Sequence, residues 1–285
     1  MKIAILPNMT RADAPQTSLR VCAKLDELGA VYLISEQYRA YFSQTSAQFL
    51  ADGAVLEACD LLLTVGGDGS IIHAAKQAAS RGKPVLGINA GCLAFMAGLE
   101  SNELQLLERL IQGGYAIDRR LMLRAAVLRG EELLSEGYCV NDAVVSLAAE
   151  RRIVELDVTL DGQFLNRYKG DGLIAATPTG STAYSLSAGG PVVDPQLESI
   201  LLTPICAHSL FSRSLLFKSE ARLCVSSPAG KELLLSRDGE TPDAVSSGCR
   251  VVIEKADRTA DFIRIKSDHF IHVLDHKLAQ WQDRF

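Results

Sequence analysis

Long hydrophobic runs are absent from the sequence: no apolar stretch approaches the ~18 residues that a membrane-spanning helix requires, so we expect no membrane association. The apolar N-terminal stretch stops at Pro7, too early for a signal peptide, and predicts a β-strand over residues 2–6 instead. Positive charge is not in excess either, because 29 Lys and Arg residues face 34 Asp and Glu residues, a formal net charge of -5. A mildly acidic surface gives no general reason to bind nucleic acid.

Paired cysteines are missing as well. The seven cysteines are scattered and form no C-x-x-C pair, which argues against a disulfide framework or a zinc site and suits a reducing cytoplasm. Three histidines (His269, His272 and His276) repeat at helical spacing near the C-terminus, a pattern more typical of a polar helix surface than of a metal site. We therefore predict a cytoplasmic protein without a metal site of its own.

The first third of the sequence alternates between two patterns. Apolar runs typical of buried strands are separated by segments whose apolar residues follow helical spacing. The strands are expected at residues 2–6, 31–34, 60–65 and 84–89, and the helices at residues 13–28, after the glycines at 66–69, and at 102–111. This alternation predicts an α/β N-terminal domain with a doubly wound parallel sheet over residues 1–115.

After about residue 115 the pattern changes to short alternating runs. Residues 153–160 alternate strictly, and Asp161-Gly162 is a two-residue hairpin signal before a partner strand. Further strands are expected at residues 163–168, 222–225, 233–236, 251–254 and 262–266. We predict a β-rich, sandwich-like C-terminal domain over residues 116–266, followed by a helix at 267–285 that could return to the first domain.

The sequence Gly66-Gly67-Asp68-Gly69 follows directly on a predicted buried strand. Glycines allow a backbone to approach a ligand closely, and a helix that starts here would direct free N–H groups at a phosphate. A carboxylate repels such an anion, so its presence points to metal coordination or to removal of a proton from an attacking hydroxyl. A tight turn with Asp68 as the N-cap is the alternative without a function.

A second segment, residues 170–191, is rich in small residues, and five of the six residues at 177–182 are Gly, Ser or Thr. Such residues beside a helix that opens near Thr182 favour an anion- or ribose-binding loop, and Tyr184 offers an aromatic face to a purine. A solvated turn is the alternative. Asn141-Asp142, two polar residues inside an apolar run, could hold ribose hydroxyls or a base edge, or could form a β-bulge.

Taken in order, these segments resemble the NAD kinase family. The resemblance rests on Gly66-Gly67-Asp68-Gly69, on Asn141-Asp142 and on residues 177–191, of which the last segment is the most specific. It covers roughly residues 60–240 and, more weakly, most of the chain. The first element alone is shared with lipid kinases and phosphofructokinases. A lipid or sugar kinase therefore stays an alternative, as does a sensor that binds NAD(H) without turnover.

The resemblance implies ATP-dependent phosphorylation of the adenosine 2′-hydroxyl of NAD⁺ to give NADP⁺, with Asp68 as general base. It implies NAD⁺ and ATP as ligands, Mg²⁺ that arrives with ATP, and a homodimer or homotetramer. The residues that it places at the substrate or nucleotide are Gly67, Gly69, His73, Asn141, Asp142, Arg152, Lys169, Asp171, Thr179, Thr182, Ala183, Tyr184 and Ser187.

Two positions depart from the pattern of the family. Ala94 stands where an N-x-G-x-L-G-F segment usually has glycine, and we expect this to alter packing beside the site more than its chemistry. Glu240 ends an Asp-Gly-Glu sequence where the family has D-G-Q, so its carboxylate would be an additional negative neighbour for a phosphate.

Overall fold

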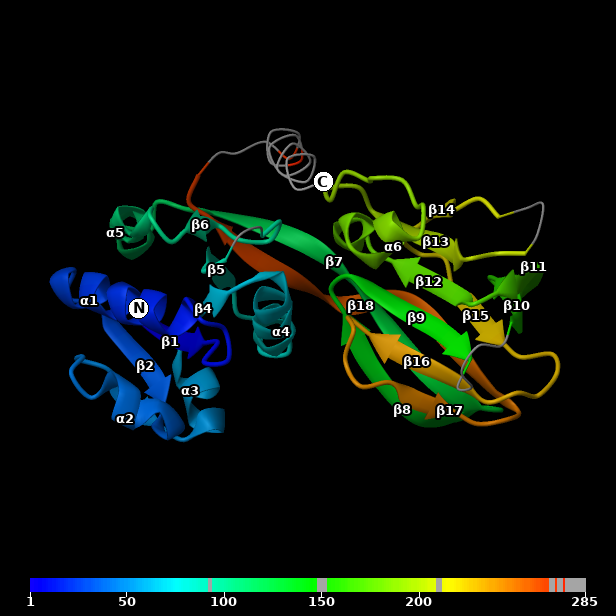
Figure 1. The fold of residues 1–285 in the computed structure, drawn as a ribbon, viewed down its shortest axis with the longest axis horizontal. Helices are drawn as coiled ribbons and strands as arrows, with labels where there is room; N and C mark the ends of the chain where they lie inside the picture. Colours follow the sequence, from blue (N-terminus) through cyan, green and yellow to red (C-terminus); the bar gives the residue numbers. More distant parts are fainter. Residues whose placement is uncertain (92–93, 148–152, 209–211, 267–269, 271–273, 275–285) are drawn as a thin grey trace. The chain divides into compact units, whose positions relative to one another are not determined.

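The computed structural model of the chain describes residues 1–91, 94–147, 153–208, 212–266, 270 and 274 (Figure 1). The chain forms two compact units, one of Met1–Arg119 with Ala260–Phe285 and one of Arg120–Thr259. Both divisions fall inside long strands, β7 (Ala116–Arg129) and β18 (Cys249–Arg264). The predicted domain boundaries lie at residues 115 and 266. They differ from these divisions because a strand that is shared by two units shows no break in its sequence pattern. Most of the predicted helix at 267–285 lies outside the described residues.

The first unit is built on a parallel sheet in the order β3-β2-β1-β4-β5, and β6 and the end of β18 pair with β5. The strands are β1 (Lys2–Pro7), β2 (Val31–Ser35), β3 (Gln48–Leu50), β4 (Leu61–Gly66), β5 (Val85–Asn89) and β6 (Leu99–Glu100). The helices are α1 (Ala14–Glu27), α2 (Arg39–Phe42), α3 (Asp52–Ala58), α4 (Asp68–Ala79) and α5 (Leu107–Ile111), with 3-10 turns η1 (Glu36–Tyr38) and η2 (Leu104–Leu106).

Helices cover both faces of this sheet (Figure 1). Successive residues of a strand point to opposite faces. Ile3, Leu63 and Ile88 pack in one cluster with buried residues of α1 and α5. Gly87 precedes Ile88 and faces the opposite side of the sheet. A Cβ added at Gly87 would lie 2.7 Å from the Cδ1 atom of Ile71, a residue of α4. The predicted doubly wound α/β arrangement is therefore confirmed.

The second unit is β-rich. One sheet has the order β14-β13-β12-β9-β16-β17; in the other, β11, β10, β15 and β18 are neighbours and β7 pairs with β18 and β8. One core cluster collects buried residues from both sheets, among them Leu156, Leu173 and Leu223, which confirms the predicted β-rich unit. Its elements are β8 (Glu132–Cys139), β9 (Asp142–Leu147), β10 (Val154–Leu160), β11 (Gln163–Gly170), β12 (Gly172–Ala176), η3 (Thr179–Thr182), α6 (Tyr184–Ser187), β13 (Ser199–Ile205), β14 (Leu215–Lys218), β15 (Leu223–Ser226), β16 (Leu233–Arg237) and β17 (Asp243–Val245).

The predicted hairpin at Asp161-Gly162 is present between β10 and β11, and both turn residues have the positive φ that such turns require (50° and 83°). The two strands predicted at 251–254 and 262–266 are parts of the single strand β18, since no Gly or Pro interrupts residues 250–264. The helix predicted over 102–111 is shorter, and consists of η2 and α5.

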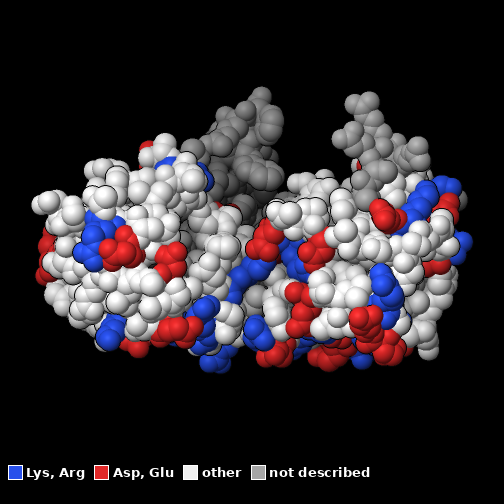
Figure 2. All heavy atoms as spheres, turned by 90° about the horizontal axis from the view of Figure 1, so that it is seen from below, with Lys and Arg blue, Asp and Glu red and all other residues white. Residues whose placement is uncertain are grey.

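Acidic and basic side chains are intermingled on the face shown in Figure 2. Many of the charges form ion pairs, such as Arg124 with Glu136 and Glu254, and Arg167 with Asp157. Within the described part of the chain, no helix is both long and apolar enough to cross a membrane.

Candidate functional site

The turn of residues 66–70 joins β4 to α4 in the first unit. Gly67 is the N-cap of α4, with an extended backbone (φ -101°, ψ -173°). A Cβ at Gly66 would lie 2.5 Å from the Ser70 Oγ atom, and one at Gly67 would lie 2.5 Å from an Arg11 guanidinium nitrogen. The short Ser70 side chain therefore favours glycine at position 66 by its close approach and not through positive φ, whereas the end of the flexible Arg11 side chain could move away from a Cβ at position 67. Arg11 was not predicted, since it lies more than 50 residues before the turn.

Asp68 is the first residue of α4 and is half-buried. Its Oδ2 atom accepts a hydrogen bond from the Phe95 N–H and its Oδ1 atom accepts one from the Met96 N–H, both at 2.9 Å. Each carboxylate oxygen has two lone pairs and so can accept more than one hydrogen bond. Gly67 occupies the N-cap, so Asp68 is not the capping residue that the alternative interpretation required. The carboxylate is thus fixed in orientation and still able to accept a proton.

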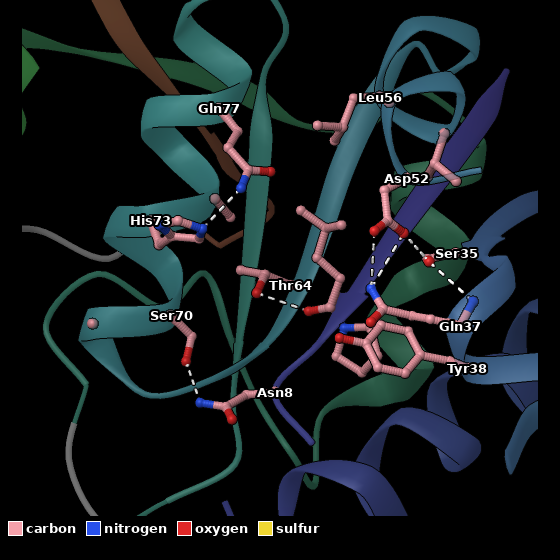
Figure 3. Close-up of a pocket in the computed structure, with 16 residues that line it drawn as sticks. Asn8, Ser35, Gln37, Tyr38, Asp52, Leu56, Thr64, Ser70, His73 and Gln77 are labelled. Carbon is pink, nitrogen blue, oxygen red and sulfur yellow. Dashed lines mark hydrogen bonds between the residues drawn. The ribbon is translucent and has the colours of Figure 1, made fainter. Parts of the chain in front are cut away.

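A cavity of about 640 Å³ opens beside this turn (Figure 3). Two of the predicted residues, Gly69 and His73, line it. The His73 Nε2 atom lies 2.8 Å from the Gln77 side-chain nitrogen. This contact holds the His73 ring along α4, one turn before Gln77.

A second cavity, of about 380 Å³, lies in the second unit and brings together four of the predicted residues. Asn141 and Asp142 line it from the start of β9, and Ala183 and Tyr184 from the start of α6. The Tyr184 side chain is 47% exposed, so its ring is accessible to a planar ligand. The four lining residues that were not predicted as site residues are Val144, Ser236, Asp238 and Gly239.

Asp238 holds the Asn141-Asp142 segment in place. Its carboxylate accepts hydrogen bonds from three successive backbone N–H groups, those of Val140 (2.8 Å), Asn141 (2.7 Å) and Asp142 (3.1 Å). Asp238 and Gly239 both have positive φ (51° and 72°), so a tight turn directs the carboxylate at this segment. The Asp-Gly pair was the signal in the sequence, but the sequence did not indicate which segment it binds.

The two carboxylates also interact with each other. Asp142 is 5% exposed, and its burial, followed by the negative charge of Asp238, raises its pKa from 3.8 to about 7. Near neutral pH, Asp142 is therefore divided between a neutral form that can donate a hydrogen bond and a charged form that only accepts. A hydroxyl-rich ligand in this cavity can bind either form.

Replacing Asp142 by Asn is expected to remove a pH dependence of stability. The folded-state pKa of about 7 lies above the ordinary value of 3.8, so the folded state keeps the proton longer and loses stability as the pH rises from 4 to 7. Between pH 5 and pH 8 the wild type should lose roughly 2–3 kcal/mol relative to the variant. Urea unfolding of both proteins at the two pH values measures this difference. An identical pH dependence in the two proteins would contradict the assignment.

The hydroxyl groups of residues 177–185 mainly build the loop itself. The Thr177 hydroxyl donates to the Val140 carbonyl (2.6 Å) and the Ser181 hydroxyl donates to the Pro178 carbonyl (2.6 Å). Thr179 accepts from Arg120 (3.3 Å). Thr182 donates to the Thr179 carbonyl (3.3 Å) and Ser185 lies 2.9 Å from the Thr203 hydroxyl. The predicted role of Thr179 and Thr182 at a ligand stays a prediction.

Four further predicted residues lie apart from the second cavity or outside the described chain. Lys169 pairs with Glu155 on the adjacent strand (2.9 Å). Asp171, between β11 and β12, raises the pKa of the neighbouring Cys206 thiol. Ser187 ends α6. Arg152 lies outside the described residues.

The structure also describes the two residues that depart from the family pattern, Ala94 and Glu240. Ala94 is buried and directly precedes Phe95 and Met96, whose N–H groups bind Asp68. A change at this position therefore acts on the packing beside the carboxylate. Glu240 is exposed, and its N–H donates to the Arg237 carbonyl (3.0 Å).

The chain matches two family models. Residues 11–115 match the model described as the ATP-NAD kinase N-terminal domain, and residues 140–265 match the ATP-NAD kinase C-terminal domain. The NAD kinase of Symbiobacterium thermophilum is 38% identical over 282 residues, which cover 98% of this chain and 99% of that protein. The NAD kinase of Moorella thermoacetica is 37% identical over 286 residues, which cover 99% of this chain and 91% of that protein.

Two solved structures share the fold. The yeast NADH kinase complexed with NADH has a TM-score of 0.89 at 23% identity, and the match covers 98% of this chain and 87% of that one. An NAD kinase from Archaeoglobus fulgidus in complex with ATP has a TM-score of 0.75 at 21% identity, and the match covers 98% and 99% of the two chains.

Proposed function

The chain belongs to the ATP-NAD kinase family, and from this we propose that it transfers the γ-phosphate of ATP to the 2′-hydroxyl of the adenosine ribose of NAD⁺. The products are NADP⁺ and ADP. A bond forms between the 2′-oxygen and the γ-phosphorus, the bond from that phosphorus to the β–γ bridging oxygen breaks, and the hydroxyl proton leaves. The alternatives, a lipid or sugar kinase and a sensor without turnover, receive no support from the family matches.

The observation that supports this chemistry is the position of Asp68. Its carboxylate is oriented by the Phe95 and Met96 N–H groups at the start of α4, which suits a general base that takes the proton of the sugar hydroxyl. Such a base contributes roughly 10²–10⁴ in rate, because a sugar hydroxyl is a poor nucleophile. Most of the remaining rate enhancement comes from the positioning of the two substrates.

We assign NAD⁺ binding to the cavity of the second unit. Asn141 and Asp142 offer amide and carboxyl groups to hydroxyls or a base edge, and the exposed ring of Tyr184 can stack on a planar group. Contacts with substrate or nucleotide are proposed on the family resemblance alone for Gly67, Gly69, His73, Arg152, Lys169, Asp171, Thr179, Thr182, Ala183 and Ser187.

Mg²⁺ is proposed to enter bound to ATP, as part of that substrate. Among the described residues, no group of three or more His, Cys, Asp or Glu side chains is arranged to hold a metal ion. A Mg²⁺ ion that is bound through substrate phosphates and water does not need such a group. Bound there, it neutralises the negative charge of the triphosphate.

A homodimer or homotetramer in the cytoplasm is proposed from the same resemblance. No disulfide joins the described cysteines, which fits a reducing compartment. Sedimentation of the purified protein measures the oligomeric state.

The activity is tested by incubating the purified protein with ATP, MgCl₂ and NAD⁺ and by following NADP⁺ with an NADP-specific dehydrogenase. We expect NADP⁺ to form only when all three are present. Phosphorylation of diacylglycerol or a hexose in its place would support the lipid or sugar kinase. Saturable NAD⁺ binding without product would support the sensor.

A further inference from the structure

Phe95 and Met96, whose N–H groups bind the Asp68 carboxylate, lie in a segment without regular structure. Residues 94–98 form neither helix nor strand, so the repeating hydrogen bonds of a helix or sheet do not fix these two N–H groups. The direction of the carboxylate therefore depends on what holds this segment from its other side. A functional group is placed accurately only when the residues around it are themselves held.

Arg264, the last residue of β18, binds this segment. Its Nη1 atom donates to the Ala97 carbonyl (3.2 Å) and to the Met96 carbonyl (3.4 Å). Met96 is thus held on both sides, because its N–H donates to the Asp68 Oδ1 atom (2.9 Å). A guanidinium carries five N–H groups in a planar fork, so one side chain can bind several acceptors at once. Through Met96, Arg264 is connected to the proposed base by two hydrogen bonds.

The guanidinium is itself held by Asp118 of β7. The Arg264 Nε atom donates to the Asp118 Oδ2 atom at 3.0 Å. The two side chains are only 22% and 10% exposed, so solvent and salt screen this ion pair less than the pairs on the surface. The guanidinium carbon also lies 5.7 Å from the centre of the Phe262 ring, a cation–π contact. These contacts fix the direction in which the fork meets the Met96 and Ala97 carbonyls.

Close packing limits the path of the same segment. A Cβ added at Gly98 would lie 2.8 Å from the Ile263 carbonyl oxygen of β18, and the Gly98 N–H donates to the Gly87 carbonyl of β5 (2.9 Å). The packing places the segment between these two strands. The bonds from Arg264 then set the direction of the peptide groups that precede Gly98.

We propose that Arg264 is a positioning residue for the phosphoryl transfer. It holds the Met96 and Ala97 carbonyls, so that the N–H groups of Phe95 and Met96 keep the Asp68 carboxylate directed at the 2′-hydroxyl whose proton it takes. Arg264 acts through this segment and not by contact with the substrate. A displacement of about 1 Å at a reacting group can cost roughly 100-fold in rate. The inference rests on the proposed function, because it takes Asp68 as the base.

Arg264→Met tests the proposal, because methionine keeps an unbranched stem and removes every donor. The substitution should lower kcat about tenfold or more and leave the KM values for ATP and NAD⁺ within about twofold. In an Asp68→Asn background it should lower kcat less than about threefold, since the base that Arg264 orients is already absent. Arg124→Met is the matched control, because Arg124 is 29% exposed, forms ion pairs with Glu136 and Glu254, and belongs to the second unit. It should leave kcat within about twofold of the wild type.

Three results would overturn the inference: a folded Arg264→Met protein with the kcat of the control, a change confined to KM, or the same fall in kcat in the Asp68→Asn background. Arg264→Lys serves if the methionine variant does not fold. Lysine keeps a positive charge beside Asp118, but its compact ammonium group does not reproduce the planar fork. We expect its kcat to fall about threefold or more. A kcat equal to that of the wild type would overturn the inference as well.

Amide hydrogen exchange follows the segment independently of activity. The Phe95 and Met96 N–H groups should exchange about tenfold faster or more in Arg264→Lys than in the wild type, and at the wild-type rate in Arg124→Met. Equal exchange in all three proteins would contradict the proposal. Faster exchange in Arg264→Lys, together with a wild type that makes no NADP⁺, would refute the proposed function and retain Arg264 as the residue that orders this segment.

Discussion

Replacing Asp68 by Asn is expected to lower kcat at least ~100-fold while NAD⁺ still binds. Asn has nearly the shape of Asp but cannot take up the proton of the 2′-hydroxyl, so the chemical step loses its base and the substrate loses few contacts. Steady-state kinetics gives kcat, and calorimetric titration gives the dissociation constant for NAD⁺. A variant that binds NAD⁺ normally and keeps more than about a tenth of the wild-type kcat would exclude Asp68 as the base.

The same substitution also has a structural effect that must be measured separately. The asparagine side chain would keep one acceptor oxygen, and its amide nitrogen would face the N–H group of Phe95 or Met96, so one of the two hydrogen bonds is lost. The expected cost is about 1–3 kcal/mol of unfolding free energy. Asp13→Asn is a suitable control, because Asp13 is exposed and its side chain makes no capping hydrogen bond at α1. Thermal denaturation of both variants then separates the loss of stability from the loss of catalysis.

Gly180→Ala is expected to weaken NAD⁺ binding at least tenfold and to lower stability by about 1–3 kcal/mol or more. An added Cβ would lie 2.1 Å from the Asn141 carbonyl oxygen and 2.5 Å from its carbonyl carbon. These are backbone atoms that cannot rotate away, and the Thr177 N–H already binds the same carbonyl (2.8 Å). The segment that carries Asn141 and Asp142 therefore has to move. Calorimetric titration with NAD⁺ and urea unfolding measure the two effects.

Gly114→Ala is the control for this substitution. An added Cβ at Gly114 would have its nearest neighbour at 3.4 Å, an ordinary contact, and Gly114 belongs to the first unit. It should leave NAD⁺ binding unchanged. A Gly180→Ala protein with the NAD⁺ affinity of this control would show that close packing on Asn141 does not position the site.

Sequence patterns predicted those parts of the fold and site that depend on neighbouring residues. The alternation of strands and helices and the Asp161-Gly162 turn follow from local preferences of the backbone, as does a helix beside the glycines at 66–69, although α4 begins at Asp68 and so earlier than predicted. Asn141 and Tyr184 were predicted from their motifs, and the structure brings them to one cavity, because the loop after β12 is bonded to the segment before β9.

Interactions between distant residues could not be predicted in this way. Asp238 binds the N–H of Asp142 across 96 positions of sequence, and a turn motif does not say which segment its carboxylate reaches. Arg11 comes to the glycine turn only through the pairing of β1 with β4. The hydroxyl-rich pattern of residues 177–182 also gave no sign that the Thr177 and Ser181 side chains are directed into the loop.

The position of the Asp68 carboxylate relative to bound substrate is the most direct test of this account. A crystal structure of the protein with NAD⁺ should show an Asp68 carboxylate oxygen within hydrogen-bond distance of the adenosine 2′-oxygen, in addition to the bonds from Phe95 and Met96. If the 2′-oxygen instead lies out of reach of Asp68, the proposed catalytic role of this residue is wrong.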